Sequence, residues 1–132
     1  MNPRLLLDTH IVIRWLSDLK KLSREQHMVL GDAVRRGECV GVSAFTLLEI
    51  VLLAEGRRIR AGLDELFQEL STNTAIRIIP LTTDVALEVA ALGDALRDPG
   101  DRVIVATACV HRLRLITADQ RIIESALVPV VE

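Results

Sequence analysis

Four acidic residues occupy positions from which they could carry out chemistry together. Asp8 ends the apolar run LLLD, Asp119 follows the apolar run RLITA, and Asp101 precedes the apolar segment RVIVATA. Glu49 is the only charged residue in AFTLLEIVLLA, residues 44–54. Carboxylates without suitably spaced histidines or cysteines are typical of sites for hard cations such as Mg²⁺ or Mn²⁺. The sequence therefore predicts a divalent-cation site, provided that the fold brings these acids together.

Each of these acids also has a purely structural interpretation. Asp8, Asp101 and Asp119 could cap helices, which stabilises a helix by about 1 kcal/mol, and Glu49 could pair with an arginine. However, a buried carboxylate without a partner is costly, and four carboxylates in one pocket would repel one another until some took up protons. A bound cation removes both costs, so the convergence of four acids favours the cation.

Hydrophobic periodicity predicts the elements that position the acids. Strands are expected at residues 4–8, 39–43, 76–80, 114–117 and 128–131. Helices are expected at residues 11–16, 23–37, 44–54, 59–70, 82–96 and 102–112, with a short helix after Asp119 and a turn at RDPGDR, residues 97–102. Alternating strands and helices are typical of an α/β fold with a mostly parallel sheet. Since such strands end at one edge, where ligands bind, the acids are expected at that edge.

Composition and charge limit the classes of protein to which the chain can belong. Its 132 residues are enough for one domain, and with 50% hydrophobic but 2% aromatic residues its core must be aliphatic. No apolar run reaches the roughly 20 residues of a membrane span and no signal-peptide pattern is present, so we expect a cytoplasmic protein without membrane contact. With a net charge of −2, any contact with nucleic acid must be local. Arg57, Arg58 and Arg60 could bind phosphate or face a partner, although a solvated helix end is the simpler interpretation.

Four sequence motifs, in order, resemble those of PIN-domain ribonucleases, and most of all the VapC-type toxins of bacterial toxin–antitoxin pairs. The motifs are LLLDTH, VSAFTLLEI, DPGDRVIVATA and LITADQRI. The resemblance covers almost the whole chain and implies a single PIN domain over residues 1–132. It also implies a three-layer α/β/α fold with a central, mostly parallel five-stranded sheet.

The resemblance implies an Mg²⁺-dependent endoribonuclease, with Mn²⁺ able to substitute, that hydrolyses RNA phosphodiester bonds with metal-activated water. One set of residues would bind the metal and catalyse: Asp8, Glu49, Asp101 and Asp119. A second set would orient carboxylates, bound water or substrate: Thr9, Ser43, Arg102 and Thr117. A helix cap is the simpler interpretation of Ser43, and an ion pair is an equal alternative for Arg102. We interpret His10 as a polar residue of the first helical turn rather than as a general base.

The resemblance further implies macromolecular partners. These are an RNA substrate, a cognate VapB-like antitoxin whose C-terminal segment lies over the acidic cleft, and a second copy of the chain in a homodimer. Contact with DNA would occur only indirectly, through the antitoxin.

Two other functions remain compatible with the residues. A metal-dependent phosphatase or phosphotransferase would use Asp8 as an aspartyl nucleophile, although DTH lacks the second aspartate that such enzymes usually place two positions on. A noncatalytic interaction module would use the acids only as helix caps, and would have no affinity for divalent ions.

Overall fold

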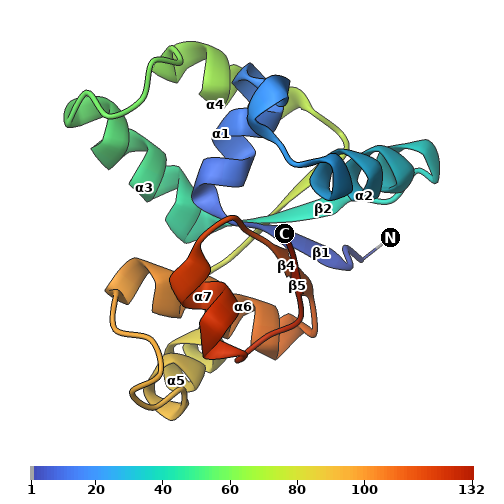
Figure 1. Cartoon of the computed structure of the whole chain (residues 1–132). Helices are drawn as coiled ribbons and strands as arrows, with labels where there is room; N and C mark the ends of the chain where they lie inside the picture. The colour runs from blue at the N-terminus through green and yellow to red at the C-terminus, as the bar shows by residue number, and fades with distance from the viewer. Residues whose placement is uncertain (1) are drawn as a thin grey trace.

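The computed structural model describes residues 2–132, and in that range it contains five strands, seven α-helices and one short 3₁₀ helix (Figure 1). The strands are β1 (Leu5–Leu7), β2 (Val40–Ser43), β3 (Ile76–Ile79), β4 (Arg114–Ile116) and β5 (Val130–Val131). The helices are α1 (Thr9–Ser17), η1 (Leu19–Lys21), α2 (Arg24–Arg35), α3 (Ala44–Glu55), α4 (Leu63–Thr72), α5 (Thr83–Ala91), α6 (Pro99–His111) and α7 (Gln120–Ser125). The alternation of strands and helices predicted from the sequence is therefore confirmed.

The strands form one sheet in the order β3-β2-β1-β4-β5, and every neighbouring pair is parallel. The chain adds β2 and β3 on one side of β1 and then returns to add β4 and β5 on the other side. Such a reversal beside the first strand leaves a crevice at the carboxyl edge of the sheet, where α/β proteins bind ligands. Asp8 follows β1 directly and so stands at this crevice.

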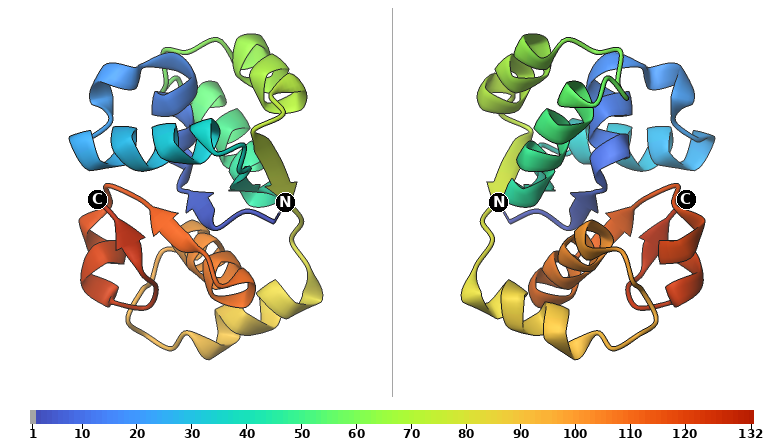
Figure 2. Two further views of the ribbon diagram at one scale, coloured as in Figure 1. Left: turned by 90° about the vertical axis from the view of Figure 1, so that its right-hand side faces the viewer. Right: turned by 90° about the vertical axis from the view of Figure 1, so that its left-hand side faces the viewer.

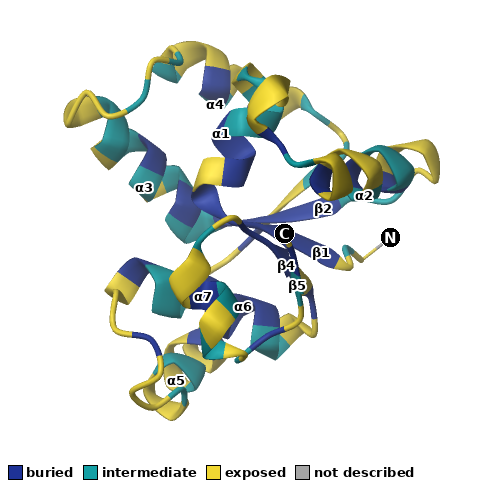
Figure 3. Cartoon of the chain, in the orientation of Figure 1, coloured by how far each residue is buried: buried dark blue, intermediate teal, exposed yellow. Residues whose placement is uncertain are grey.

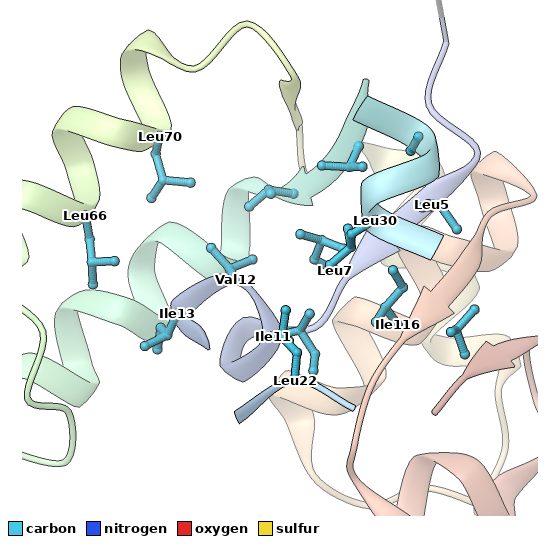
Figure 4. Packing of buried hydrophobic residues seen from close by; sticks show 14 of the residues in the cluster. Leu5, Leu7, Ile11, Val12, Ile13, Leu22, Leu30, Leu66, Leu70 and Ile116 are labelled. Carbon is cyan, nitrogen blue, oxygen red and sulfur yellow. The ribbon is translucent and has the colours of Figure 1, made fainter. Parts of the chain in front are cut away.

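Helices cover both faces of the sheet, with α1 to α4 on one side and α5 to α7 on the other (Figure 2). Because successive side chains of a strand point to opposite faces, Leu5 and Leu7 of β1 join the core cluster under α1 to α4, whereas Leu6 joins the cluster under α6 and α7. Figure 3 shows the central strands buried between the two helical layers, and Figure 4 shows Leu7 among residues of the first cluster, including Ile11 and Leu30. The chain is thus a three-layer α/β/α structure, as predicted.

Several helix boundaries differ from those predicted. The segment RDPGDR is not only a turn, because α6 begins at Pro99 with Asp98 as its N-cap, and the Asp98 side chain accepts a hydrogen bond of 2.9 Å from the Asp101 amide. Proline suits the first helical position, where its missing N–H has no helical partner. Asp101 therefore lies in the first turn of α6 rather than at its cap.

Two further boundaries are corrected for similar reasons. Helix α5 ends at Ala91 rather than at residue 96, because Gly93 takes a left-handed conformation with φ of 74°. Helix α4 begins only at Leu63 rather than at residue 59. The connection before it, residues 56–62, contains Arg57 at φ of 54° and packs Ile59 and Ala61 against the first core cluster.

Arg102 is the predicted site residue that the structure places elsewhere. Its guanidinium donates hydrogen bonds of 2.6 to 2.7 Å to the carbonyl oxygens of Val89, Gly93 and Leu96, at and beyond the end of α5. Arg102 therefore neither orients the acids nor forms the ion pair that was the alternative. It fastens the α5–α6 connection to α6.

This role predicts that Arg102→Met destabilises the fold. Three hydrogen bonds from a charged donor are lost, and we expect the free energy of unfolding to fall by about 2 kcal/mol. Urea denaturation measures the change, with the exposed Arg97→Met as the matched control. A loss no greater than that of the control would show that these hydrogen bonds contribute nothing net.

None of the helices between residues 2 and 132 has the length and apolarity to cross a bilayer.

Candidate active site

A cavity of about 560 Å³ opens at the carboxyl edge of the sheet, beside β1 and β4. Its charged and hydroxyl-bearing lining residues are Asp8, Thr9, Glu49, Asp98, Asp101, Asp119, Arg14, Arg58 and Arg121. All four acids singled out in the sequence therefore face one cavity, although they come from four different parts of the chain. Asp98 is a fifth carboxylate that the sequence interpretation missed.

Asp8 is held rigidly at the end of β1. One of its carboxylate oxygens accepts a 2.8 Å hydrogen bond from the Thr9 amide, and the other accepts a 2.7 Å bond from the Thr117 hydroxyl. The Thr117 hydroxyl in turn accepts a 3.0 Å bond from the Asp119 amide, so it links the ends of β1 and β4. Burial raises the pKa of Asp8 by more than the bonds from Thr117 and Thr9 lower it.

Glu49 reaches the cavity from α3 and is oriented by two threonines. The Thr9 hydroxyl donates a 2.5 Å hydrogen bond to Glu49 Oε1 and lies 3.0 Å from the hydroxyl of the buried Thr46. Since Thr9 has one hydroxyl proton and gives it to Glu49, Thr46 must be the donor to Thr9. Burial, followed by the charges of Asp8 and Asp98, raises the pKa of Glu49 despite the bond from Thr9.

Asp101 has the least compensated carboxylate of the site. Among residues 2–132, no group lies within hydrogen-bond distance of its buried Oδ2 atom, and the Arg121 guanidinium is 3.7 Å away. Burial, together with the charges of Asp98, Asp119 and Asp8, raises the pKa of Asp101 to about 7. Near neutral pH this carboxyl therefore carries a proton for much of the time unless another cation is present.

Asp119 lies at the exposed side of the cavity, where it caps α7. It accepts a 2.9 Å hydrogen bond from the Arg121 amide and faces the Arg121 guanidinium at 3.2 Å. Burial acts to raise the pKa of Asp119, but the hydrogen bonds and charge of Arg121 outweigh it, and the pKa is lowered overall. Asp119 is thus the one predicted acid whose pKa the fold lowers.

The sequence interpretation missed three residues of the site: Asp98, Arg121 and Thr46. Asp98 stands immediately before Pro99, and this pair is a helix-start signal. From the sequence alone, Asp98 is instead assigned to the turn at residues 97–102. Arg121 lies two residues after Asp119 and Thr46 three before Glu49, but neither carries a signal of its own, because each acts through a neighbour distant in the sequence.

Two further residues considered in the sequence analysis, Ser43 and His10, have more ordinary positions. The Ser43 hydroxyl accepts a 3.0 Å hydrogen bond from the Phe45 amide and so caps α3, as the simpler interpretation had it. His10 lies in the first turn of α1 and is exposed at the cavity.

The chemistry of the donor set fits a hard divalent cation. Between residues 2 and 132, no three His, Cys, Asp or Glu side chains are already arranged so that together they could hold a metal ion. Nevertheless, burial raises the pKa values of Asp8, Glu49 and Asp101, and the Asp101 Oδ2 atom has no hydrogen-bond partner in the described chain, so a bound cation would stabilise all three carboxylates. Oxygen ligands in this number suit Mg²⁺ and Mn²⁺ better than zinc.

Comparison with known proteins places this fold and site in a family. The PIN-domain family model matches residues 5–126. Ribonuclease VapC22 of Mycobacterium tuberculosis is 33% identical over 120 residues, which cover 89% of this chain and 88% of that protein. The crystal structure of FitAcB from Neisseria gonorrhoeae superposes with a TM-score of 0.66 at 26% identity, covering 97% of this chain and 96% of that one.

A toxin-antitoxin complex from Klebsiella pneumoniae is similar to the same degree. It has a TM-score of 0.66 and 25% identity, and it covers 97% of this chain and 96% of the other. The matched residues include β1 to β4 and all the acids that line the cavity. The chain therefore belongs to the PIN-domain family and is a homologue of a VapC ribonuclease.

Proposed function

We propose that the protein is a divalent-metal-dependent endoribonuclease and the toxin of a VapBC-type toxin–antitoxin pair. The observation that carries the proposal is the convergence of Asp8, Glu49, Asp101 and Asp119 on one cavity, with the Asp101 Oδ2 atom buried and without a hydrogen-bond partner in the described chain. Membership of the PIN-domain family and the relationship to Ribonuclease VapC22 supply the reaction class.

The four acids would hold Mg²⁺, for which Mn²⁺ could substitute because both cations prefer oxygen ligands. When bound, the cation supplies Lewis-acid activation of water and neutralises charge that develops on the phosphate. Thr117 and the Thr9 amide fix the Asp8 carboxylate, while the Thr46–Thr9 pair of hydroxyls fixes Glu49. Because its pKa is raised to about 7, Asp101 would release a proton on binding a cation near neutral pH.

The two hydrogen bonds to Asp8 also weigh against the aspartyl-nucleophile alternative. Both carboxylate oxygens are already engaged, and the residue is only 8% exposed. Such fixed orientation benefits a metal ligand, whereas an aspartyl nucleophile is usually accompanied by a second aspartate two positions on, which DTH lacks.

Partners follow from the relatives. The similarity to a toxin-antitoxin complex supports a cognate VapB-like antitoxin. We propose that its C-terminal segment covers the acidic cavity and that DNA is contacted only through it. We further propose that residues 1–132 form a single PIN domain, that the chain pairs with a second copy, and that it acts in the cytoplasm, where its RNA substrate is made.

A cleavage assay tests the proposed function. Purified protein is incubated with end-labelled RNA, with or without EDTA, and cleavage should require added Mg²⁺ or Mn²⁺. The Asp8→Asn variant should not cleave under either condition. Cleavage that survives EDTA, or that is equal in Asp8→Asn and the wild type, would contradict the proposal.

Gly100 is the second residue of α6, and its substitution tests the geometry of the site without replacing any acidic residue. A Cβ atom there would lie 2.7 Å from Glu49 Oε2 and 3.2 Å from Phe45. The end of the flexible Glu49 side chain is the group that can move, so Gly100→Ala should fold normally but displace that carboxylate. Since the loss of correct ligand orientation commonly lowers metal affinity 10- to 100-fold, we expect Mn²⁺ affinity to fall about tenfold.

Isothermal titration calorimetry measures this affinity. Gly31→Ala in α2 is the matched control, because its added methyl group would meet only the side chain of Arg35. Equal Mn²⁺ affinity in Gly100→Ala and Gly31→Ala would show that Glu49 is not part of the metal site.

A further inference from the structure

A second cavity, of about 570 Å³, adjoins the acidic one. It is lined by residues of α1, by Asp18 and Lys21 just after α1, and by the connection from α3 to α4. His10, Arg14 and Arg58 line both cavities, so the two are adjacent and share a rim. Any extended ligand that leaves the acidic centre in this direction must therefore enter the second cavity.

The charge of this second cavity is opposite to that of the first. We call this second cavity the basic groove. Its cationic lining residues are Arg14, Lys21, Arg58 and Arg60. Asp18 is the one acid that lines it in the described chain, and its carboxylate is 3.8 Å from the Lys21 ammonium. Over residues 2–132, no carboxylate lies within 4.0 Å of the guanidinium groups of Arg14, Arg58 or Arg60.

Guanidinium groups that have no carboxylate partner and lie in one groove can bind an anionic ligand. The protein as a whole carries a net charge of −2 and its catalytic cavity is lined by five carboxylates, so a polyanion gains no affinity from the molecule at large. Guanidinium groups grip phosphate oxygens through paired hydrogen bonds. The basic groove is therefore the part of this surface that can offset the repulsion between a phosphate chain and the acids.

We propose that the basic groove binds the phosphate backbone of single-stranded RNA on one side of the bond that is cut. This inference rests on the proposed ribonuclease function and adds to it the path of the substrate. A strand with one phosphate at the carboxylates has its next phosphates a few ångströms away, and the groove begins at the rim that both cavities share. Cations make up four of its ten lining residues, which favours a phosphate chain over a peptide segment of the antitoxin.

The arginine cluster contains its own control. Arg58 and Arg60 line the basic groove, whereas the neighbouring Arg57, which is exposed as they are, lines neither cavity. All three lie in the same connection between α3 and α4. If RNA passes through the groove, RNA affinity should depend on Arg58 and Arg60 but not on Arg57. If RNA is attracted only by positive charge in general, all three arginines should contribute equally to the affinity.

Binding of a fluorescein-labelled oligouridylate, followed by fluorescence anisotropy in EDTA, separates binding from cleavage. Each phosphate contact with a single strand contributes about 0.7 to the slope of log affinity against log salt. The double variant Arg58→Gln/Arg60→Gln should therefore lower that slope by about 1.4 and weaken binding about tenfold or more at low salt. Arg57→Gln should match the wild type, and thermal melts should show that all three proteins are folded.

The outcomes distinguish the inference from the function on which it rests. Unchanged RNA affinity in the double variant, an equal loss in Arg57→Gln, or no RNA binding by the wild type would each overturn the basic groove as the RNA path. If the double variant binds RNA normally but loses affinity for the antitoxin, the occupant is the antitoxin and the inference is wrong. If the groove binds RNA as described but the wild type fails to cleave with Mg²⁺, the groove stands and the nuclease proposal fails.

Discussion

Replacing Asp101 by Asn is expected to abolish RNA cleavage while making the metal-free protein more stable. The asparagine removes one charged ligand of the proposed metal site, and an expected loss of about 4 kcal/mol of transition-state stabilisation corresponds to a fall in kcat/KM of about 10³-fold. The same change removes a carboxylate that is buried beside other acids and whose pKa is raised to about 7. Near pH 7 its neutral replacement should therefore raise the unfolding free energy of the metal-free protein by about 1 kcal/mol.

Cleavage kinetics with Mg²⁺ and thermal melts in EDTA measure the two effects on one preparation. Asp94→Asn is the matched control, because Asp94 is an exposed acid in the α5–α6 connection. It should change neither quantity. An Asp101→Asn protein that is less stable than the wild type in EDTA would contradict the predicted gain in stability, and one that still cleaves like the control would remove Asp101 from the proposed site.

The second large effect concerns pH and metal together. Asp8, Glu49 and Asp101 have raised pKa values in the folded protein, so the fold retains protons that the unfolded chain has already released. The sign follows from linkage: the metal-free protein should lose stability as the pH rises from about 4 to about 7. Asp119, whose pKa is lowered, contributes in the opposite sense, and its contribution is lost only as the pH falls below its ordinary value.

A divalent cation should reverse this loss, because it replaces the retained protons. We therefore expect saturating Mg²⁺ or Mn²⁺ to raise the Tm more at about pH 8 than at about pH 5, where protons compete for the same carboxylates. Differential scanning fluorimetry in EDTA and in each metal measures the effect, with monovalent salt of equal ionic strength as the control. A metal effect on the Tm that is the same at both pH values would mean that these acids do not bind the cation.

Much of the site could be predicted because strand periodicity and residue type are local properties. LLLD and RLITAD place Asp8 and Asp119 at strand ends from the sequence alone, and a parallel sheet then brings such ends to one edge. Glu49 could be singled out because a lone charge on an apolar helix needs a partner. The order β3-β2-β1-β4-β5 has no such local signal, since which strands pair depends on packing across the whole chain.

The residues that were misjudged are those whose role depends on distant partners. Arg102 stands beside Asp101 in sequence, yet its side chain points to carbonyl oxygens near the end of α5. Asp98 was read as part of a turn but both caps α6 and adds its charge to the cavity. The paired threonine hydroxyls at Thr9 and Thr46 also become visible only when α1 and α3 are side by side.

Binding of the cation itself is the most direct test of the account. A crystal of the protein without its antitoxin, soaked in Mn²⁺, should give an anomalous difference peak in the cavity between Asp8 and Asp101, with Glu49 and Asp119 drawn toward it. A fully open cavity without such a peak, or a peak bound only to other residues, would contradict the claim that these acids form a metal site.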